Sequence, residues 1–175
     1  FYDEKDGMPS AVVTQVIEIP DSEGRPQIWI GTSRGIARFD GLRFHPISGS
    51  DNLVGKNIFS LQVTRDPDGS RWLWAGTSSR GASRLRLDGK DAGWETFSSL
   101  THPSLPSDTV LSVAEDRRGR VYLCTTRGVV RLTPRRSPPT RASIVPISPG
   151  LRPAAARIAN NRKLVVVFPF VPVTP

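Results

Sequence analysis

Residues 28–41 read Ile-Trp-Ile-Gly-Thr-Ser-Arg-Gly-Ile-Ala-Arg-Phe-Asp-Gly, and this stretch decides the fold. It predicts a short apolar strand, a polar turn, a second strand and a tight Asp-Gly turn. The same order returns as Leu-Trp-Ala-Gly-Thr at 73–77 and as Leu-Cys-Thr-Thr at 123–126. Each copy is followed by an Arg-Gly pair, at 34–35, 80–81 and 127–128. A repeat of roughly 40–50 residues built of short strands is typical of propeller blades.

The pattern around these copies predicts an all-β fold, a partial β-propeller of about three four-stranded antiparallel blades. We expect the blades at residues 7–50, 51–100 and 101–133, the third of them incomplete. The expected strands are 12–19, 28–31, 36–39 and 42–47, then 58–63, 72–76, 82–87 and 94–97, then 110–115, 121–125 and 129–133. The outer strand of the third blade, due near 135–140, is missing from the pattern.

Residues 134–175 differ in composition from the repeats. They contain no acidic residue and nine of the 16 prolines of the chain. The last acidic residue is Asp116, so residues 117–175 carry a net charge of +12 and residues 1–116 a net charge of −4, and the positive charge of the chain comes from its C-terminal part. A basic, proline-rich stretch of this kind predicts an irregular tail, disordered or foreign to the repeat, and we expect no nucleic-acid binding. Residues 165–168 are the one apolar run in the tail that could form a strand.

No arrangement of residues in the sequence predicts catalysis. His45 and His102 are the only histidines, and each precedes a proline rather than standing near a nucleophile motif. Cys124 is the only cysteine, which excludes an intrachain disulfide and a cysteine-based metal site. The turn that begins at Asp66 lacks the glutamate and the flanking helices of a calcium loop. We therefore expect no catalytic residue, no metal and no cofactor.

Two tryptophans and five glycines of the repeat are expected to be structural. Trp29 and Trp74 hold equivalent places and should pack between neighbouring blades. The glycines permit tight turns and close backbone approaches, at Gly31, Gly35, Gly76, Gly81 and Gly128. Because three blades leave a ring open, we expect exposed apolar faces around Leu61, Trp74 and Val113, and a chain that aggregates or self-associates.

One repeated feature suggests a binding site. Arg34, Arg80 and Arg127 each precede the glycine of the turn between the second and third strands of a blade. In an antiparallel blade this turn and the link to the next blade emerge on the same face, so the three arginines should share a face. They are either ordinary exposed turn residues or a basic rim for an anionic ligand or an acidic partner surface.

The first blade resembles the two-component regulator propeller repeat. The resemblance is carried by Asp-Gly-Met-Pro-Ser at 6–10, Trp-Ile-Gly-Thr at 29–32 and Gly-Ile-Ala-Arg-Phe-Asp-Gly at 35–41. The family repeat opens with Gly-Leu-Pro-Ser and runs through Leu-Trp-Ile-Gly-Thr to Gly-Leu-x-Arg-Phe-Asp-Gly. The resemblance extends through the third blade, where it places Leu123 at the tryptophan position and Thr125 at the glycine position.

This resemblance implies a sensor. Such repeats are similar to the extracytoplasmic ligand-binding propellers of bacterial hybrid histidine kinases, or of relatives with other output domains. Those relatives usually add further repeats, a β-sandwich, a membrane span and a signalling output. The resemblance implies a periplasmic or extracytoplasmic location of a full-length relative, although residues 1–6 do not open a signal peptide and no run of about 18 apolar residues occurs.

The expected function is therefore ligand sensing by a non-catalytic propeller segment of a bacterial two-component protein. The ligand would be an oligosaccharide or another anion, bound at the propeller face. Other blades or a second chain are expected as partners, and a membrane only through parts of a full-length relative. One alternative is an interaction scaffold without a small ligand, and another is a propeller lyase or hydrolase.

Overall fold

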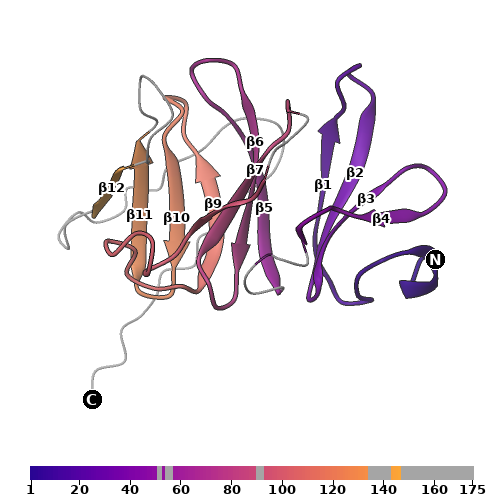
Figure 1. Cartoon of the computed structure of the whole chain (residues 1–175), viewed down its shortest axis with the longest axis horizontal. Coiled ribbons are helices and arrows are strands. Elements are labelled where there is room, and N and C mark those ends of the chain that lie inside the picture. Colours follow the sequence, from indigo (N-terminus) through magenta and orange to yellow (C-terminus); the bar gives the residue numbers. More distant parts are fainter. Residues whose placement is uncertain (51–52, 54–56, 90–92, 134–142, 147–175) are drawn as a thin grey trace.

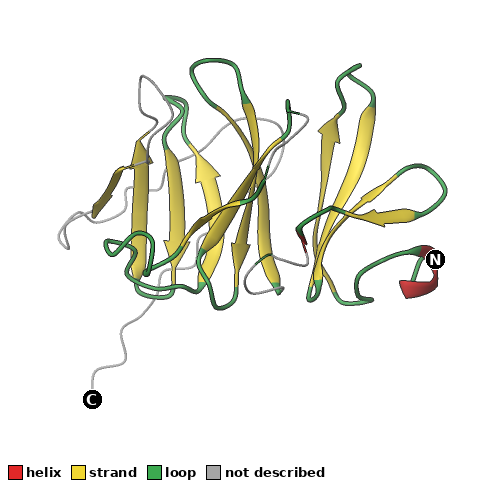
Figure 2. Cartoon of the chain, in the orientation of Figure 1, coloured by secondary structure: helices red, strands yellow, loops and turns green. Residues whose placement is uncertain are grey.

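The computed structural model describes residues 1–50, 53, 57–89, 93–133 and 143–146. Within them the chain forms three four-stranded antiparallel sheets that stand side by side (Figure 1 and Figure 2). The first sheet contains β1 (Val13–Pro20), β2 (Pro26–Thr32), β3 (Gly35–Phe39) and β4 (Phe44–Pro46). The second contains β5 (Ile58–Arg65), β6 (Arg71–Thr77), β7 (Ala82–Arg86) and β8 (Glu95–Phe97). The third contains β9 (Val110–Glu115), β10 (Val121–Thr125), β11 (Gly128–Thr133) and β12 (Ser143–Pro146).

Strands that follow one another in the chain pair with one another, so each sheet is an up-and-down meander of the kind that makes a propeller blade. The first strands of the sheets are adjacent, because β1 contacts β5 and β5 contacts β9. The last strands of the three sheets, β4, β8 and β12, therefore lie on the outer side of the arc. The described sheets form an open arc rather than a closed ring (Figure 1). The prediction of a partial propeller of about three antiparallel blades is confirmed.

The third blade has a fourth strand, and the prediction that its outer strand is missing is wrong. β12 pairs with β11, with Ile144 opposite Leu132 and Val145 opposite Arg131. It lies further along the chain than the repeat predicts, inside the stretch that its composition marks as a tail. An outer strand can be this short and can end in a proline, because one of its edges needs no partner. The possible strand at 165–168 lies outside the described residues.

Each hairpin between the first two strands of a blade closes with an Asp-x-x-Gly turn. The glycine N–H donates to the aspartate carbonyl in every blade: Gly24 to Asp21 (3.2 Å), Gly69 to Asp66 (2.9 Å) and Gly119 to Asp116 (3.0 Å). These turns lie at one edge of the arc, the upper edge in Figure 1. The repeat in sequence is thus a repeat in backbone hydrogen bonding.

Apolar cores fill the two interfaces between blades. Trp29 from the first blade packs in a cluster with Leu61 and Leu73 of the second. Trp74 from the second blade packs in a cluster with Val113 and the other apolar residues of the third. Each tryptophan therefore lies between its own blade and the next. Burial of such large rings stabilises each interface by more than the roughly 1.5–3 kcal/mol of an aliphatic side chain.

The expectation of exposed apolar faces at Leu61, Trp74 and Val113 is wrong, since these side chains are only 2%, 2% and 6% exposed. All three belong to the interfaces on either side of the middle blade. The open face is instead on the first blade, where Val16 and Ile28 are exposed. Their register positions correspond to those of Leu61 and Leu73, which the first blade covers.

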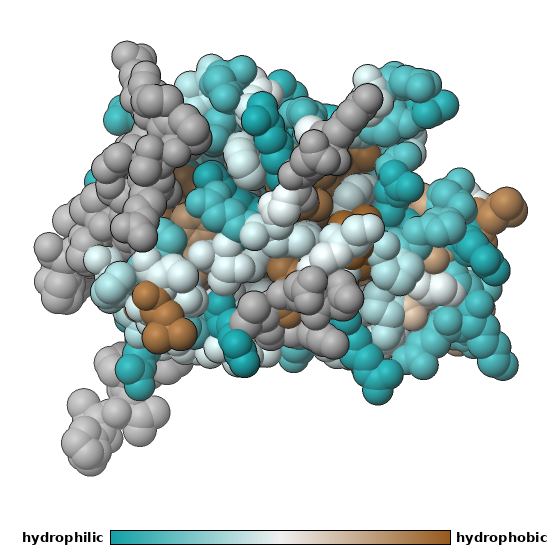
Figure 3. All heavy atoms as spheres, viewed as in Figure 1, coloured by the Kyte–Doolittle hydropathy of each residue, from teal (hydrophilic) through white to brown (hydrophobic). Residues whose placement is uncertain are grey.

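The first residues of the chain form part of the first blade. A 3-10 turn, η1 (Glu4–Asp6), is capped by Asp3, and the Tyr2 ring packs edge-on against Phe39 and Phe44. Among the described residues, no helix has the length and apolar character needed to cross a bilayer. Figure 3 shows hydrophilic and neutral side chains over much of one face, with hydrophobic atoms visible between the blades.

Candidate ligand-binding face

The turns that carry Arg34, Arg80 and Arg127 share one hydrogen-bonded geometry. In the first blade the Thr32 hydroxyl donates to the Gly35 carbonyl at 2.9 Å and accepts from the Arg34 N–H at 3.1 Å. The same two bonds recur in the other blades, from Thr77 to Gly81 (2.8 Å) and from Arg80 to Thr77 (3.2 Å), and from Thr125 to Gly128 (2.8 Å) and from Arg127 to Thr125 (3.1 Å). In each turn, one threonine hydroxyl therefore donates to the glycine carbonyl and accepts from the arginine N–H.

A third bond ties each turn to the segment that enters its blade. The N–H of the residue after the threonine donates to a carbonyl of that segment: Ser33 to Val12 (3.0 Å), Ser78 to Asn57 (3.1 Å) and Thr126 to Thr109 (3.2 Å). The turns β2–β3, β6–β7 and β10–β11 consequently lie at one edge of the arc, opposite the Asp-x-x-Gly turns (Figure 1). The shared face inferred for the three arginines is the face these turns form.

The three arginine side chains are exposed at this edge. Arg34 Nη1 lies 3.9 Å from Glu4 Oε1, and the two side chains are 70% and 53% exposed. An ion pair of that length and exposure contributes little to stability. Among the described residues, Arg80 and Arg127 make no ion pair. Three cations are thus held by ordered turns while their charges face solvent. We call this set the arginine edge.

The titratable residues that could support catalysis have structural contacts. His45 bonds to Asp40 through its Nε2 at 2.5 Å, and the His102 ring stacks on Phe97 at 4.7 Å. Burial raises the pKa of the Cys124 thiol, which keeps it protonated and weakly nucleophilic. In the part of the chain that the structure describes, no three His, Cys, Asp or Glu side chains come together as metal ligands would.

The strand register corrects the alignment of the third repeat by one residue. Thr125 pairs with Gly128 as Thr32 pairs with Gly35, so Thr125 holds the threonine position rather than the glycine position. Tyr122 then holds the tryptophan position, and it faces Arg131 across the hairpin. In the same way Trp29 faces Arg38 and Trp74 faces Arg84. Cys124 takes the place of the glycine. The Thr-x-Arg-Gly sequence shared by the first and third blades would have revealed this register.

Residues 104–127 match the family model described as Two component regulator propeller. The chain carries a two-component regulator propeller repeat. The matched stretch of this repeat runs from the segment that enters the third blade through β9 and β10, and it ends at Arg127 of the arginine edge. The hydrogen bonds shared by the three turns extend the same repeat geometry to the other blades.

Two solved structures from B. thetaiotaomicron are similar to this propeller segment. One, described as the extracellular domain of a hybrid two component system, BT3049, has 20% identity and a TM-score of 0.57, over 72% of this chain and 17% of that one. The other, described as the extracellular domain of a one component system, BT4673, has 18% identity and a TM-score of 0.39, over 83% of this chain and 23% of that one. No curated protein matches the chain. The first likeness shows a shared fold, and the segment spans a small part of that structure's length.

Proposed function

We propose that this chain is a ligand-sensing segment of the propeller of a bacterial two-component signalling protein. Its ligand, or the acidic surface of a partner, binds at the arginine edge formed by Arg34, Arg80 and Arg127. The observation that carries the proposal is the repetition of an exposed arginine on the same threonine-locked turn in neighbouring blades. The family match supports the signalling role, and the extracellular origin of the similar domains supports a location outside the cytoplasm.

The chemistry of the edge favours an anion. Guanidinium groups donate paired hydrogen bonds to carboxylate, sulfate or phosphate oxygens. Since the turns are ordered by their own backbone and threonine bonds, binding need not order the loops. An acidic oligosaccharide could span several turns and contact one arginine in each. The role is non-catalytic, because His45, His102 and Cys124 are held in structural contacts or kept protonated.

A scaffold without a small ligand is the second candidate, and it has its own support. Val16 and Ile28 are exposed on an open face of the first blade. This face corresponds to the face of the second blade that the first blade covers. That face would recruit a protein or a further blade rather than a soluble anion. The two candidates therefore use different surfaces and can be separated by substitution.

The experiment replaces Arg34, Arg80 and Arg127 by alanine in a complete propeller that contains these blades. An acidic oligosaccharide panel is titrated at several salt concentrations. We expect binding that weakens with salt, since exposed charges are screened over about 10 Å at 0.1 M. The triple variant should lose this binding and keep its fold, because exposed substitutions usually change stability by about 0.5 kcal/mol or less.

The matched control removes the same charge elsewhere, at the exposed Arg43, Arg117 and Arg118. This control should retain most of the binding if the arginine edge is the site. Equal losses in both triple variants would mean that net charge alone attracts the ligand. Unchanged binding in the first variant would return its arginines to the role of ordinary turn residues.

A further inference from the structure

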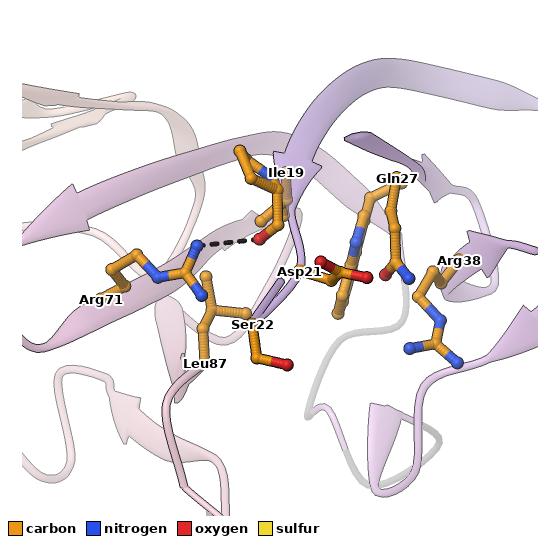
Figure 4. Close-up of a pocket in the computed structure, with 9 residues that line it drawn as sticks. Ile19, Asp21, Ser22, Gln27, Arg38, Arg71 and Leu87 are labelled. Atoms are coloured by element: carbon orange, nitrogen blue, oxygen red, sulfur yellow. Dashed lines mark hydrogen bonds between the residues drawn. The ribbon is translucent and has the colours of Figure 1, made fainter. Parts of the chain in front are cut away.

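A cavity of about 210 Å³ lies between the first and second blades, beside the Asp-x-x-Gly turn of the first. The first blade contributes Asp21, Ser22, Gln27, Trp29 and Arg38, and the second contributes Arg71 and Leu87 (Figure 4). The cavity is at the edge opposite the arginine edge, so a ligand bound in it is independent of the function proposed for that edge. Its volume is several times that of a water and below the roughly 300–1,000 Å³ of pockets for drug-sized ligands.

Most charges at the cavity have partners. Asp21 Oδ2 accepts from Arg25 Nε at 2.9 Å. Arg71 Nε donates to Asp88 Oδ1 at 2.8 Å, and Arg71 Nη1 donates to the Pro20 carbonyl at 2.8 Å, which joins the two blades. Arg38 differs, because no ion pair involves it among the described residues. One uncompensated positive charge therefore borders the cavity.

Two hydrogen-bond donors of the cavity walls are also left over. The indole Nε1 of Trp29 and the Nε of Arg38 are both buried without a hydrogen-bond partner. Trp29 as a whole is 8% exposed. A buried donor that lacks an acceptor is costly, and native proteins leave few of them. Both residues line the cavity, so an acceptor bound there would relieve the cost once the side-chain atoms that now cover the two donors move aside.

The equivalent place in the second blade shows how the same two side chains find partners within the protein. Trp74 Nε1 donates to Thr64 Oγ1 at 3.1 Å, and Arg84 Nε donates to Glu95 Oε2 at 2.7 Å. Trp72 occupies the intervening space, with the Arg84 guanidinium 4.1 Å from the ring centre. Trp74 and Arg84 therefore have partners within the protein, although the Nε1 of Trp72 is itself buried without one.

The first blade lacks each of these three groups. By strand register, Ile19 stands in the place of Thr64, Gln27 in the place of Trp72, and His45 in the place of Glu95. The hydroxyl, the filling ring and the carboxylate are therefore absent together. His45 is bonded to Asp40 instead, and it lies directly across the strand pair from Arg38.

We propose that this cavity binds a small monocarboxylate, whose oxygens replace Glu95 and Thr64 as acceptors for Arg38 and Trp29. A planar carboxylate matches the paired donors of a guanidinium. The carboxylate of Asp21 also lines the cavity and repels a dianion, so a single negative charge fits best. Ser22 and Gln27 offer further hydrogen bonds to hydroxyl groups of an organic acid.

The test titrates the chain with lactate and follows the N–H signals of Trp29 Nε1 and Arg38 Nε by NMR. Lactamide, which has the same size and no charge, is the matched probe. We expect both signals to shift and saturate with lactate, and lactamide to bind about tenfold more weakly or worse, because a charged hydrogen bond is lost. Absence of saturable shifts with lactate, or equal shifts with lactamide, overturns the proposal.

Substitutions taken from the second blade make the test sharper. His45→Glu supplies Arg38 with the partner that Arg84 has, so it should abolish lactate binding. His45→Gln removes the same bond to Asp40 without adding a charge, so it should leave lactate binding unchanged. Gln27→Trp should fill the cavity as Trp72 does and also abolish binding. If the two His45 variants bind lactate equally, whether both bind or both fail, the assignment of Arg38 as the anion ligand is wrong.

Discussion

Asp66 and Asp116 begin the same turn in neighbouring blades, yet their pKa values move in opposite directions. Burial raises the pKa of Asp66. Burial acts on Asp116 as well, but the N–H groups of Arg120 and Arg118 and the Arg120 guanidinium outweigh it and hold the pKa of Asp116 below its ordinary value. Burial costs Asp66 more than Asp116, and Asp66 also lacks the cation that comes after the turn, because the second blade has Ser70 where the third has Arg120.

These directions give opposite predictions for Asp→Asn variants. Asp116 contributes stability above its unfolded-state pKa of about 3.9, and this is lost as the pH falls through the lower folded-state pKa. Ionised Asp66 destabilises the fold above its raised folded-state pKa, and this penalty disappears as the pH falls below the unfolded-state value. At neutral pH, Asp116→Asn should therefore lower the free energy of unfolding, by about 1 kcal/mol or less, and Asp66→Asn should raise it.

Urea unfolding at neutral pH and again in acid measures both effects, and each difference from the parent chain should fade in acid. Two variants that shift stability in the same direction at neutral pH would contradict the assignment of the two pKa directions. The turn itself was predictable from Asp-x-x-Gly. The opposite pKa shifts were not, because they depend on burial and on cations brought near by folding.

At the scale of single elements, the β6–β7 turn has no space for a side chain at Gly81. Gly81 has φ 84°, and a Cβ added there would overlap the Phe97 carbonyl oxygen. Gly69 in the β5–β6 turn has φ 87°, with nothing within 4 Å of an added Cβ. The two glycines therefore share a left-handed backbone and differ only in the space around them.

Gly69→Ala should lower the free energy of unfolding by about 1–2 kcal/mol, because alanine is strained in the left-handed conformation. Gly81→Ala should cost clearly more, since β8 must also move away from the turn. Thermal or urea unfolding of the pair measures the difference directly. Equal costs would show that β8 yields to the added methyl group without loss of packing.

Strands built on the repeat were predictable, and those outside it were not. The Arg-Gly pairs, the Asp-x-x-Gly turns and the alternating apolar residues place β1 to β11, because all three repeat from blade to blade. β12 comes after a long proline-rich connection, so neither signal identifies it. The position of Tyr122 was missed for a related reason. The β9–β10 hairpin is shorter than its counterparts, so spacing from the aspartate turn misleads while spacing from the threonine turn does not.

At the scale of the whole molecule, the open face of the first blade should promote self-association. Val16 and Ile28 are 49% and 36% exposed, where the corresponding Leu61 and Leu73 of the second blade are buried. Replacing both by lysine should reduce the apparent mass of the chain in light scattering without lowering its melting temperature, because neither side chain is buried in the described structure. Leu42→Lys, at a more exposed apolar residue in a turn, is the control and should leave association unchanged.

An unaltered mass in the double variant would place the contact elsewhere. The sequence predicted an open ring and an exposed apolar face, but it put that face on the wrong blade. Burial of Leu61, Trp74 and Val113 depends on which blades are neighbours. A repeat period does not say which side of each blade is left open. The cavity between the first two blades was missed in the same way, because it arises from three substitutions whose side chains meet only after folding.

The β6–β7 turn has one residue more than the β2–β3 turn, and the threonine hydroxyl still reaches the glycine carbonyl, at 2.8 Å against 2.9 Å. The extra residue between Thr77 and Gly81 thus leaves the hydrogen bond from the threonine hydroxyl to the glycine carbonyl intact. The pairing of β6 with β7 is kept by the hydroxyl of one threonine. The length of the loop between these strands can therefore change without a change in the pairing. A peptide tag or a reporter group inserted after Ser79 would be displayed at the arginine edge without disturbing the strands on either side.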